Sequence, residues 1–246
     1  MIDYKQREKN KNYWNATADD WFGMTSLPVL GVCFATEDDL HLFGDVTGKR
    51  LLEVGCGSGH SLVYQAQHSA GELWGLDISE HQLQNAAEYL KENSVQAKLI
   101  CAPMEDDCGI PEDYFDVVYS VYALGWTSDL YHTLKKLASY LKPGGTLIFS
   151  WRHPMTACTK MENGQVVFKQ SCFDAFSIGY DADGTELRFN NYQMSDYINA
   201  MAEAGFLIEK LSEQTDPLLL RREAKTEKEY KAKILPLSFV FRARKL

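Results

Sequence analysis

The sequence lacks the features that mark membrane-embedded and secreted proteins. Its 246 residues contain no run of about 18 apolar residues, the length a helix needs to cross a bilayer. The opening stretch MIDYKQREKNKN has no apolar segment behind its charges, and a secretory signal requires one. We therefore expect a cytoplasmic protein with no membrane contact, a monomer or a homodimer.

Closely paired cysteines are also missing. The six cysteines stand singly at positions 33, 56, 101, 108, 158 and 172, with no CxxC pair. Structural zinc sites use closely spaced ligands. We predict buried free thiols and no metal site.

The sequence also lacks an excess of positive charge. The formal net charge is −9, whereas basic surface supplies most of the affinity for nucleic acids, so nucleic acid is not an expected partner. Residues 221–233 are the local exception, with six basic and three acidic residues. We favour a solvated helix or loop there, with a surface for an anionic partner as the alternative.

The sequence does contain short apolar runs that alternate with longer amphipathic segments, a pattern typical of α/β domains with a parallel sheet. We predict strands at 50–54, 72–76, 97–101, 115–120 and 146–150, and helices at 58–69, 79–92 and 128–141. Ser79 is the expected N-cap of the second helix. Pro143-Gly144-Gly145 is expected to end the third.

Two segments fall outside this alternation. Residues 1–45 predict helices packed across one edge of the sheet, and residues 152–192 predict a β-rich insertion with a turn at Asp183-Gly184. A helix at 194–204, a strand near 206–213 and a last strand at 237–244 follow. We expect one domain in four parts: 1–45, a core at 46–151, the insertion at 152–192, and 193–246.

The stretch LLEVGCGSGH, residues 51–60, indicates a tight turn between a strand and a helix. Gly55, Gly57 and Gly59 suit it because such turns need positive φ and close approach of the backbone. The turn would lie at the carboxyl edge of the first strand, where open α/β sheets bind ligands.

Two carboxylates accompany the turn. Asp77 ends the second strand and can accept both hydroxyl protons of a ribose, which suits NAD and other nucleosides alike. The glycine spacing is G-x-G-x-G, however, and not the G-x-G-x-x-G that seats a pyrophosphate. Glu53 beside the turn would repel a phosphate and suit a cation or an amino group.

Further motifs follow in order: WGLDIS, APMEDD, FDVVYSVYAL and LKPGGTLIFS. Together with LLEVGCGSG they resemble the class I S-adenosylmethionine-dependent methyltransferases, of the small methyltransferase-11-like kind, over residues 48–151. The resemblance implies a Rossmann-like, mostly parallel sheet of seven strands in the order 3-2-1-4-5-7-6, with the last strand antiparallel and helices on both faces. It implies S-adenosylmethionine as cofactor and S-adenosylhomocysteine as product.

The resemblance also implies roles for residues. Glu53 would reach the amino end of the cofactor, Asp77 the ribose hydroxyls, and Ile78 the adenine. The family's acid after the third strand is replaced by Ala102 or Pro103. The full set of implied cofactor residues is Glu53, Gly55, Cys56, Gly57, Gly59, Asp77, Ile78, Met104, Glu105, Ser120, Tyr13 and Trp14.

Two of these assignments, Met104 and Glu105, have an alternative, and so does Tyr122, a candidate catalytic residue. The Met104 N–H and the Glu105 side chain would take over contact with the adenine, or Glu105 and Asp106 would cap the next turn. Tyr122, after the fourth strand, would line the methyl-transfer site or be a packed aromatic residue.

YWNATADDWFG, residues 13–23, resembles the family's lid helix. Tyr13, Trp14 and Trp21 would then shield the sulfonium, since aromatic faces attract cations. They would otherwise form the apolar face of a docking helix.

The expected chemistry is an in-line displacement helped mainly by positioning, with a base needed only where the acceptor must lose a proton. His153 is the candidate base, held extended by Pro154; a structural hydrogen bond to the insertion is its alternative. Arg152 could pair with a carboxylate of the acceptor. Aromatic residues of the insertion could wall the acceptor or form the insertion's own core: Phe168, Phe173, Phe176, Tyr180, Phe189 and Tyr192.

We predict a small-molecule acceptor methylated at O, N or C. A methyltransferase acting on tRNA or another macromolecule, using residues 221–233, is the alternative enzyme. A non-catalytic protein that binds the cofactor for regulation, and an NAD-dependent dehydrogenase, remain as further alternatives.

Overall fold

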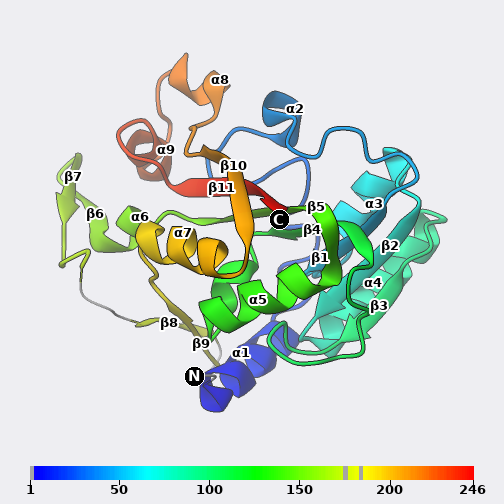
Figure 1. The fold of residues 1–246 in the computed structure, drawn as a ribbon. Helices are drawn as coiled ribbons and strands as arrows, with labels where there is room; N and C mark the ends of the chain where they lie inside the picture. Colours follow the sequence, from blue (N-terminus) through cyan, green and yellow to red (C-terminus); the bar gives the residue numbers. More distant parts are fainter. Residues whose placement is uncertain (1–2, 174–176, 183–184) are drawn as a thin grey trace.

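A seven-stranded sheet forms the centre of the molecule (Figure 1), and the computed structural model describes residues 3–173, 177–182 and 185–246 around it. Its spatial order is β10-β11-β5-β4-β1-β2-β3. Counted along the chain, the strands of this sheet have the order 3-2-1-4-5-7-6, as predicted. Only the last is antiparallel to its neighbours. The strands are β1 (Arg50–Val54), β2 (Glu72–Asp77), β3 (Lys98–Cys101), β4 (Phe115–Val121), β5 (Leu141–Arg152), β10 (Phe206–Ser212) and β11 (Ser238–Lys245).

Both faces of the sheet are buried, because successive side chains of a strand point to opposite sides. Leu52 and Val54 of β1 join one apolar core with Val118 of β4. Leu51 and Val117 join a second core on the other face. This burial explains why the central strands are continuous apolar runs rather than alternating ones. The covering helices are α3 (His60–Gln67), α4 (Glu80–Glu92), α5 (Leu130–Tyr140) and α7 (Met194–Glu203).

The predicted helix ends are correct at Ser79 and within one residue before Pro143, whereas the strand that follows begins earlier than predicted. The Ser79 side chain accepts from the Gln82 N–H at 3.1 Å and begins α4. Helix α5 ends at Tyr140, before the Pro-Gly-Gly segment, and β5 already begins at Leu141. Tyr140 and Leu141 are both buried, and Leu141 pairs with Phe115 of β4. Burial of Leu141 at the edge of the core therefore extends β5 back to Leu141, five residues before the predicted start of the strand at 146.

The amino-terminal segment holds α1 (Tyr4–Ala16) and α2 (Glu37–Leu40), and α1 lies against the insertion (Figure 1). The insertion is β-rich, as predicted, and consists of two hairpins after a short helix. The turn predicted at Asp183-Gly184 lies outside the described residues. The remaining elements are η1 (Leu124–Trp126), α6 (Pro154–Cys158), β6 (Thr159–Glu162), β7 (Gln165–Phe168), β8 (Ser177–Ala182), β9 (Thr185–Asn190), α8 (Pro217–Leu220) and α9 (Glu227–Ala232).

Candidate functional site

Two adjoining cavities lie at the carboxyl ends of the central strands. The first, of about 110 Å³, is lined by the glycine turn, the end of β2 and part of the amino-terminal segment. The second, of about 670 Å³, is lined by α1, the end of β5, β9 and α9. Six residues line both cavities: Trp14, Trp21, Met24, Thr25, Tyr122 and Trp126. The two spaces therefore meet along one shared, largely aromatic wall.

The glycine turn has the predicted left-handed backbone. The φ angles of Gly55, Gly57 and Gly59 are 73°, 48° and 77°. A Cβ on Gly55 would lie 2.2 Å from the Cβ of Ala123, so this position needs glycine to let the loop after β4 approach. Gly59 begins α3 and packs against Ala86, outside both cavities. The predicted contact of Gly59 with a cofactor therefore has no support in its position.

Asp77 lines the first cavity and is fixed by backbone donors. Its Oδ2 accepts from the Gly57 N–H and its Oδ1 from the Ser79 N–H, both at 2.9 Å. Burial raises its pKa, and these amide hydrogen bonds oppose the rise. Each carboxylate oxygen keeps a further acceptor site, so Asp77 can still receive the two hydroxyl groups of a diol.

Glu53 also lines the first cavity and is only 2% exposed. Burial raises its pKa to about 8, against the opposing hydrogen bonds from Ser61 and Tyr119. The Tyr119 hydroxyl donates to its Oε2 at 3.4 Å. A buried carboxyl group without a cationic partner favours its neutral form, so an ammonium group in this cavity would restore the charge.

Glu105 lines the cavity and holds the loop after η1. Its Oε1 accepts from the Thr127 hydroxyl at 3.0 Å and from the Ser128 N–H at 2.8 Å. Its Oε2 lies 3.9 Å from Nε of Arg7 on α1. These bonds favour a capping role for Glu105. The turn that it caps is at Thr127 and Ser128, and not the predicted one directly after Glu105. Ile78, Met104 and Cys56 line the same cavity.

Two buried polar atoms in this cavity were not anticipated from the sequence. Among the described residues, Nη1 of Arg7 and Oε1 of Gln82 have no hydrogen-bond partner. Both side chains line the first cavity. A buried unpaired donor or acceptor is costly, so a polar ligand that offered one acceptor and one donor would complete this site.

An aromatic junction, defined here as Trp14, Trp21, Tyr122 and Trp126, separates the two cavities. The ring centroids of Trp14 lie 5.4 Å from Trp21 and 5.3 Å from Trp126. The predicted positions of Trp14 and Trp21 at the site are thus seen. Tyr13 lines only the second cavity. Trp126 was missed, although it closely follows the fourth strand in the sequence.

Tyr122 has an unusual backbone conformation for a bulky residue. Its φ is 57°, a region that non-glycine residues seldom occupy. The Ser150 hydroxyl accepts from its N–H at 3.2 Å, and its own hydroxyl lies 3.1 Å from Oγ of Ser238. Such strain occurs often at functional sites, and here it points the ring at both cavities.

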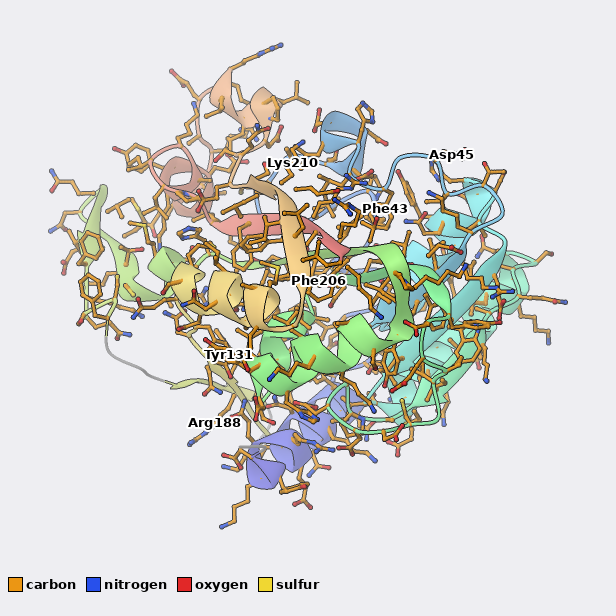
Figure 2. All side chains as sticks on the ribbon, viewed as in Figure 1. Phe43, Asp45, Tyr131, Arg188, Phe206 and Lys210 are labelled. Atoms are coloured by element: carbon orange, nitrogen blue, oxygen red, sulfur yellow. The ribbon has the colours of Figure 1, made fainter. Side chains whose placement is uncertain are left out.

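The amino-terminal segment closes over the site by contacts with both the core and the insertion. The Asn10 side chain on α1 donates to the Arg188 carbonyl at 2.8 Å and accepts from the Arg188 N–H at 2.9 Å. Arg188 lies on β9 near α1 (Figure 2). On the other side, Oδ1 of Asn15 accepts from the Ser79 hydroxyl at 2.7 Å. The amino-terminal segment and the insertion are therefore joined beside the cavities.

His153 and Ser120 lie outside both cavities. Nδ1 of His153 accepts from the Met155 N–H at 3.2 Å, so its Nε2 carries the proton and donates to Glu213 at 2.7 Å. Burial lowers its pKa, and Glu213 opposes the change. This position supports the structural alternative and not a general base. The buried Ser120 hydroxyl donates to the Val54 carbonyl at 2.8 Å, which leaves it no position beside a cofactor.

Among the described residues, no cluster of three or more histidine, cysteine or acidic side chains could hold a metal ion. The same residues include no helix with the length and apolarity to cross a membrane. The six cysteines are free; Cys101 is exposed, and only Cys56 and Cys158 are fully buried. The prediction of buried free thiols is therefore correct for Cys56 and Cys158 and wrong for Cys101.

Comparison with known proteins agrees with this geometry. Residues 52–149 match the family described as a methyltransferase domain. A 27-O-demethylrifamycin SV methyltransferase of Amycolatopsis mediterranei is 30% identical over 41% of this chain and 37% of its own length. A mitochondrial arginine-hydroxylase of Rattus norvegicus is 32% identical over 39% of this chain and 27% of its own. The chain spans about half or less of the length of the curated relatives it matches.

A solved structure supports the fold over a larger part of the chain. An S-adenosylmethionine-dependent methyltransferase from Mesorhizobium loti has a TM-score of 0.72 and 22% identity, covering 84% of this chain and 95% of its own. At this identity the likeness concerns the fold, which hosts more than one chemistry.

Proposed function

We propose that this chain, a member of the class I S-adenosylmethionine-dependent methyltransferases through residues 52–149, methylates a small molecule held in the second cavity. The family prediction is confirmed, and S-adenosylmethionine is the cofactor of that family. The observation that carries the proposal is the aromatic junction, which is shared by the first cavity, lined by Glu53 and Asp77, and the larger, more apolar second cavity.

The residues of the first cavity fit the cofactor. Glu53 suits its ammonium group and Asp77 its ribose hydroxyls, while Ile78 and Met104 offer apolar contact to the adenine. The unpaired atoms of Arg7 and Gln82 are available for its remaining polar groups. When bound, S-adenosylmethionine supplies an electrophilic methyl group on a sulfonium, and the aromatic faces at the junction favour that positive charge.

Positioning provides the main catalytic effect. Trp14, Trp126 and Tyr122 would hold the acceptor in line with the junction and keep water out, which converts an encounter into an oriented reaction. Tyr122 carries the one hydroxyl group of the aromatic junction, so it would orient the attacking atom. A role for His153 as base has no geometric support.

The direct test is transfer of labelled methyl groups from S-adenosylmethionine into a metabolite extract fractionated by size. We expect label in small molecules. Calorimetry with S-adenosylhomocysteine and with NAD tests the cofactor independently. Binding of NAD but not of S-adenosylhomocysteine would contradict the proposal, and binding without any transfer would favour a regulator.

A macromolecular acceptor has less support from the basic segment at 221–233. Arg222 pairs with Glu229 through two hydrogen bonds of 2.9 and 2.7 Å, and Lys231 is buried. These contacts favour a folded, solvated segment over a free basic patch. Label in tRNA, together with salt-sensitive RNA binding, would reverse this preference.

A further inference from the structure

The second cavity has a cationic end that the reaction itself does not require. Among the described residues, Arg152, Lys228 and Lys231 line it together with one carboxylate, that of Glu227. Arg152 ends β5, and the others belong to α9. None of these residues lines the first cavity, so the positive charge has no part in holding the cofactor.

Lys231 is the most constrained of these cations. It is 9% exposed, and its Nζ donates to the carbonyls of Thr159 at 2.8 Å and Thr156 at 3.1 Å. An ammonium group has three donors, so one remains. Within the described part of the chain, no carboxylate forms an ion pair with it. Burial lowers its pKa, and the nearby charges of Arg152 and Lys169 lower it further.

The rest of this cavity is apolar. Trp151, Phe189 and Leu237 form its wall with Trp126 of the junction. The Phe189 ring lies 5.2 Å from Trp126 and 5.7 Å from Trp151. The Arg152 guanidinium sits over Phe189 at 5.8 Å, so the cationic end continues directly into the aromatic wall.

We propose that the methyl acceptor is amphipathic: an apolar body against Trp151 and Phe189, with an anionic group, carboxylate or phosphate, at Arg152 and Lys231. Its nucleophilic atom then faces the aromatic junction. Charges buried in proteins are costly unless paired, and an anionic ligand would supply the counter-charge that Lys231 lacks. This inference rests on the proposed function, because it identifies the cavity as the acceptor site.

The test compares four probes that share one body: 3-phenylpropanoate, 3-phenylpropyl phosphate, 3-phenylpropan-1-ol and 3-phenylpropylamine. Binding to the full chain is measured by calorimetry with saturating S-adenosylhomocysteine. At least one of the two anions should bind ten times or more tighter than the alcohol, and the amine should bind weakest. The ratio of the two anions identifies the head group. Equal or undetectable binding of the anions relative to the alcohol would overturn the inference.

Variants locate the effect. Lys231→Met should reduce binding of the preferred anion at least tenfold and leave the alcohol within about twofold. Lys225→Met removes an equal charge from the exposed start of the same segment and should change neither. Arg152→Gln gives an independent test should the loss of Lys231 reduce folding. Loss of anion preference in Lys225→Met as well would assign the effect to general surface charge and overturn the site.

The two proposals can fail separately. S-adenosylhomocysteine titrated alone reports on the cofactor site, and its failure to bind would remove the proposed function. Binding of S-adenosylhomocysteine together with a preference for the alcohol or the amine would remove only the anionic acceptor.

Discussion

The two cavities are built in different ways. Most polar groups of the first come from a continuous stretch of the core, and backbone N–H groups hold Asp77 and Glu105 in place. The second is assembled from segments distant in sequence, including α1, the end of β5, β9 and α9. The acidic groups of the first are thus fixed mainly by local structure, although α1 also lines it through Arg7, Asn10 and Trp14. The shape of the second depends on how the amino-terminal segment and the insertion dock.

This difference has a consequence for binding. A site held by backbone hydrogen bonds needs little ordering when its ligand arrives, and pre-organisation preserves affinity. The second cavity depends on contacts such as the Asn10–Arg188 pair, so small changes in docking alter its walls. Substitutions in the two regions should therefore separate affinity for the cofactor from turnover of the acceptor.

The largest effect is expected at Asp77. Asp77→Ala removes the acceptor of the Gly57 and Ser79 N–H groups and the proposed partner of the ribose. Hydrogen bonds to charged groups contribute about 1.5–3 kcal/mol each, so affinity for S-adenosylhomocysteine should fall by about 100-fold or more in calorimetry. Asp116→Ala is the control: its carboxylate accepts from the Arg50 N–H at 2.8 Å, far from the cavity, and should cost stability without changing affinity.

Glu53 should make affinity depend on pH. With its pKa at about 8 in the empty site, an ammonium ligand must displace a proton at lower pH. Affinity for S-adenosylhomocysteine should therefore rise between pH 6 and 8 by up to about tenfold per pH unit, and Glu53→Gln should flatten the rise. 5′-Methylthioadenosine, which lacks the amino group, is the matched ligand. A similar slope for both ligands would rule out Glu53 as the partner of the amino group.

Glu53→Gln, which should weaken cofactor binding, should instead stabilise the protein without its cofactor. The pKa of Glu53 is raised on folding from 4.5 to about 8, so the folded state binds more protons than the unfolded state in that interval. Stability must then decrease as the pH rises through it. Glu53→Gln should raise the melting temperature at pH 8 while it weakens cofactor binding. A gain in stability together with a loss of cofactor affinity would identify the Glu53 carboxyl group as functional.

Asn10 lines the first cavity, and its bonds to β9 test how α1 docks against the insertion. Asn10→Ala removes both hydrogen bonds to the Arg188 backbone, which joins the lid to the insertion. We expect about a tenfold lower turnover, with a smaller change in cofactor affinity, and faster amide exchange in β9. Glu8→Ala changes an exposed position on the same helix as a control. An equal loss of cofactor affinity would show that α1 serves the first cavity alone.

The same contrast explains what the sequence could predict. Strands β1 to β5 were located because apolar runs and the Ser79 cap are local signals, and Glu53 and Asp77 were located through the motif beside them. Trp126, Arg7 and Gln82 were missed because tertiary docking brings them to the cavity. The need for glycine at position 125 is visible only in the structure, because a Cβ there would lie 1.8 Å from the Trp151 ring.

The structural alternative for His153 has a reason that the sequence contains. Pro154 does not simply hold an extended chain: it occupies the first turn of α6, where proline is favoured, and His153 is the N-cap. A histidine that accepts a hydrogen bond from the helix N-terminus and donates to Glu213 has neither ring nitrogen free for an acceptor. The sequence pair His-Pro indicated a helix start as much as an aimed base.

The smallest effect on activity is therefore expected at His153. His153→Gln keeps one acceptor and one donor but changes their spacing, so unfolding free energy should fall by about 1 kcal/mol, measured by urea denaturation. Turnover at a temperature where both proteins are folded should change less than twofold, whereas Tyr122→Phe at the junction should change it more. A large loss of turnover in His153→Gln, with stability intact, would restore the histidine as a base.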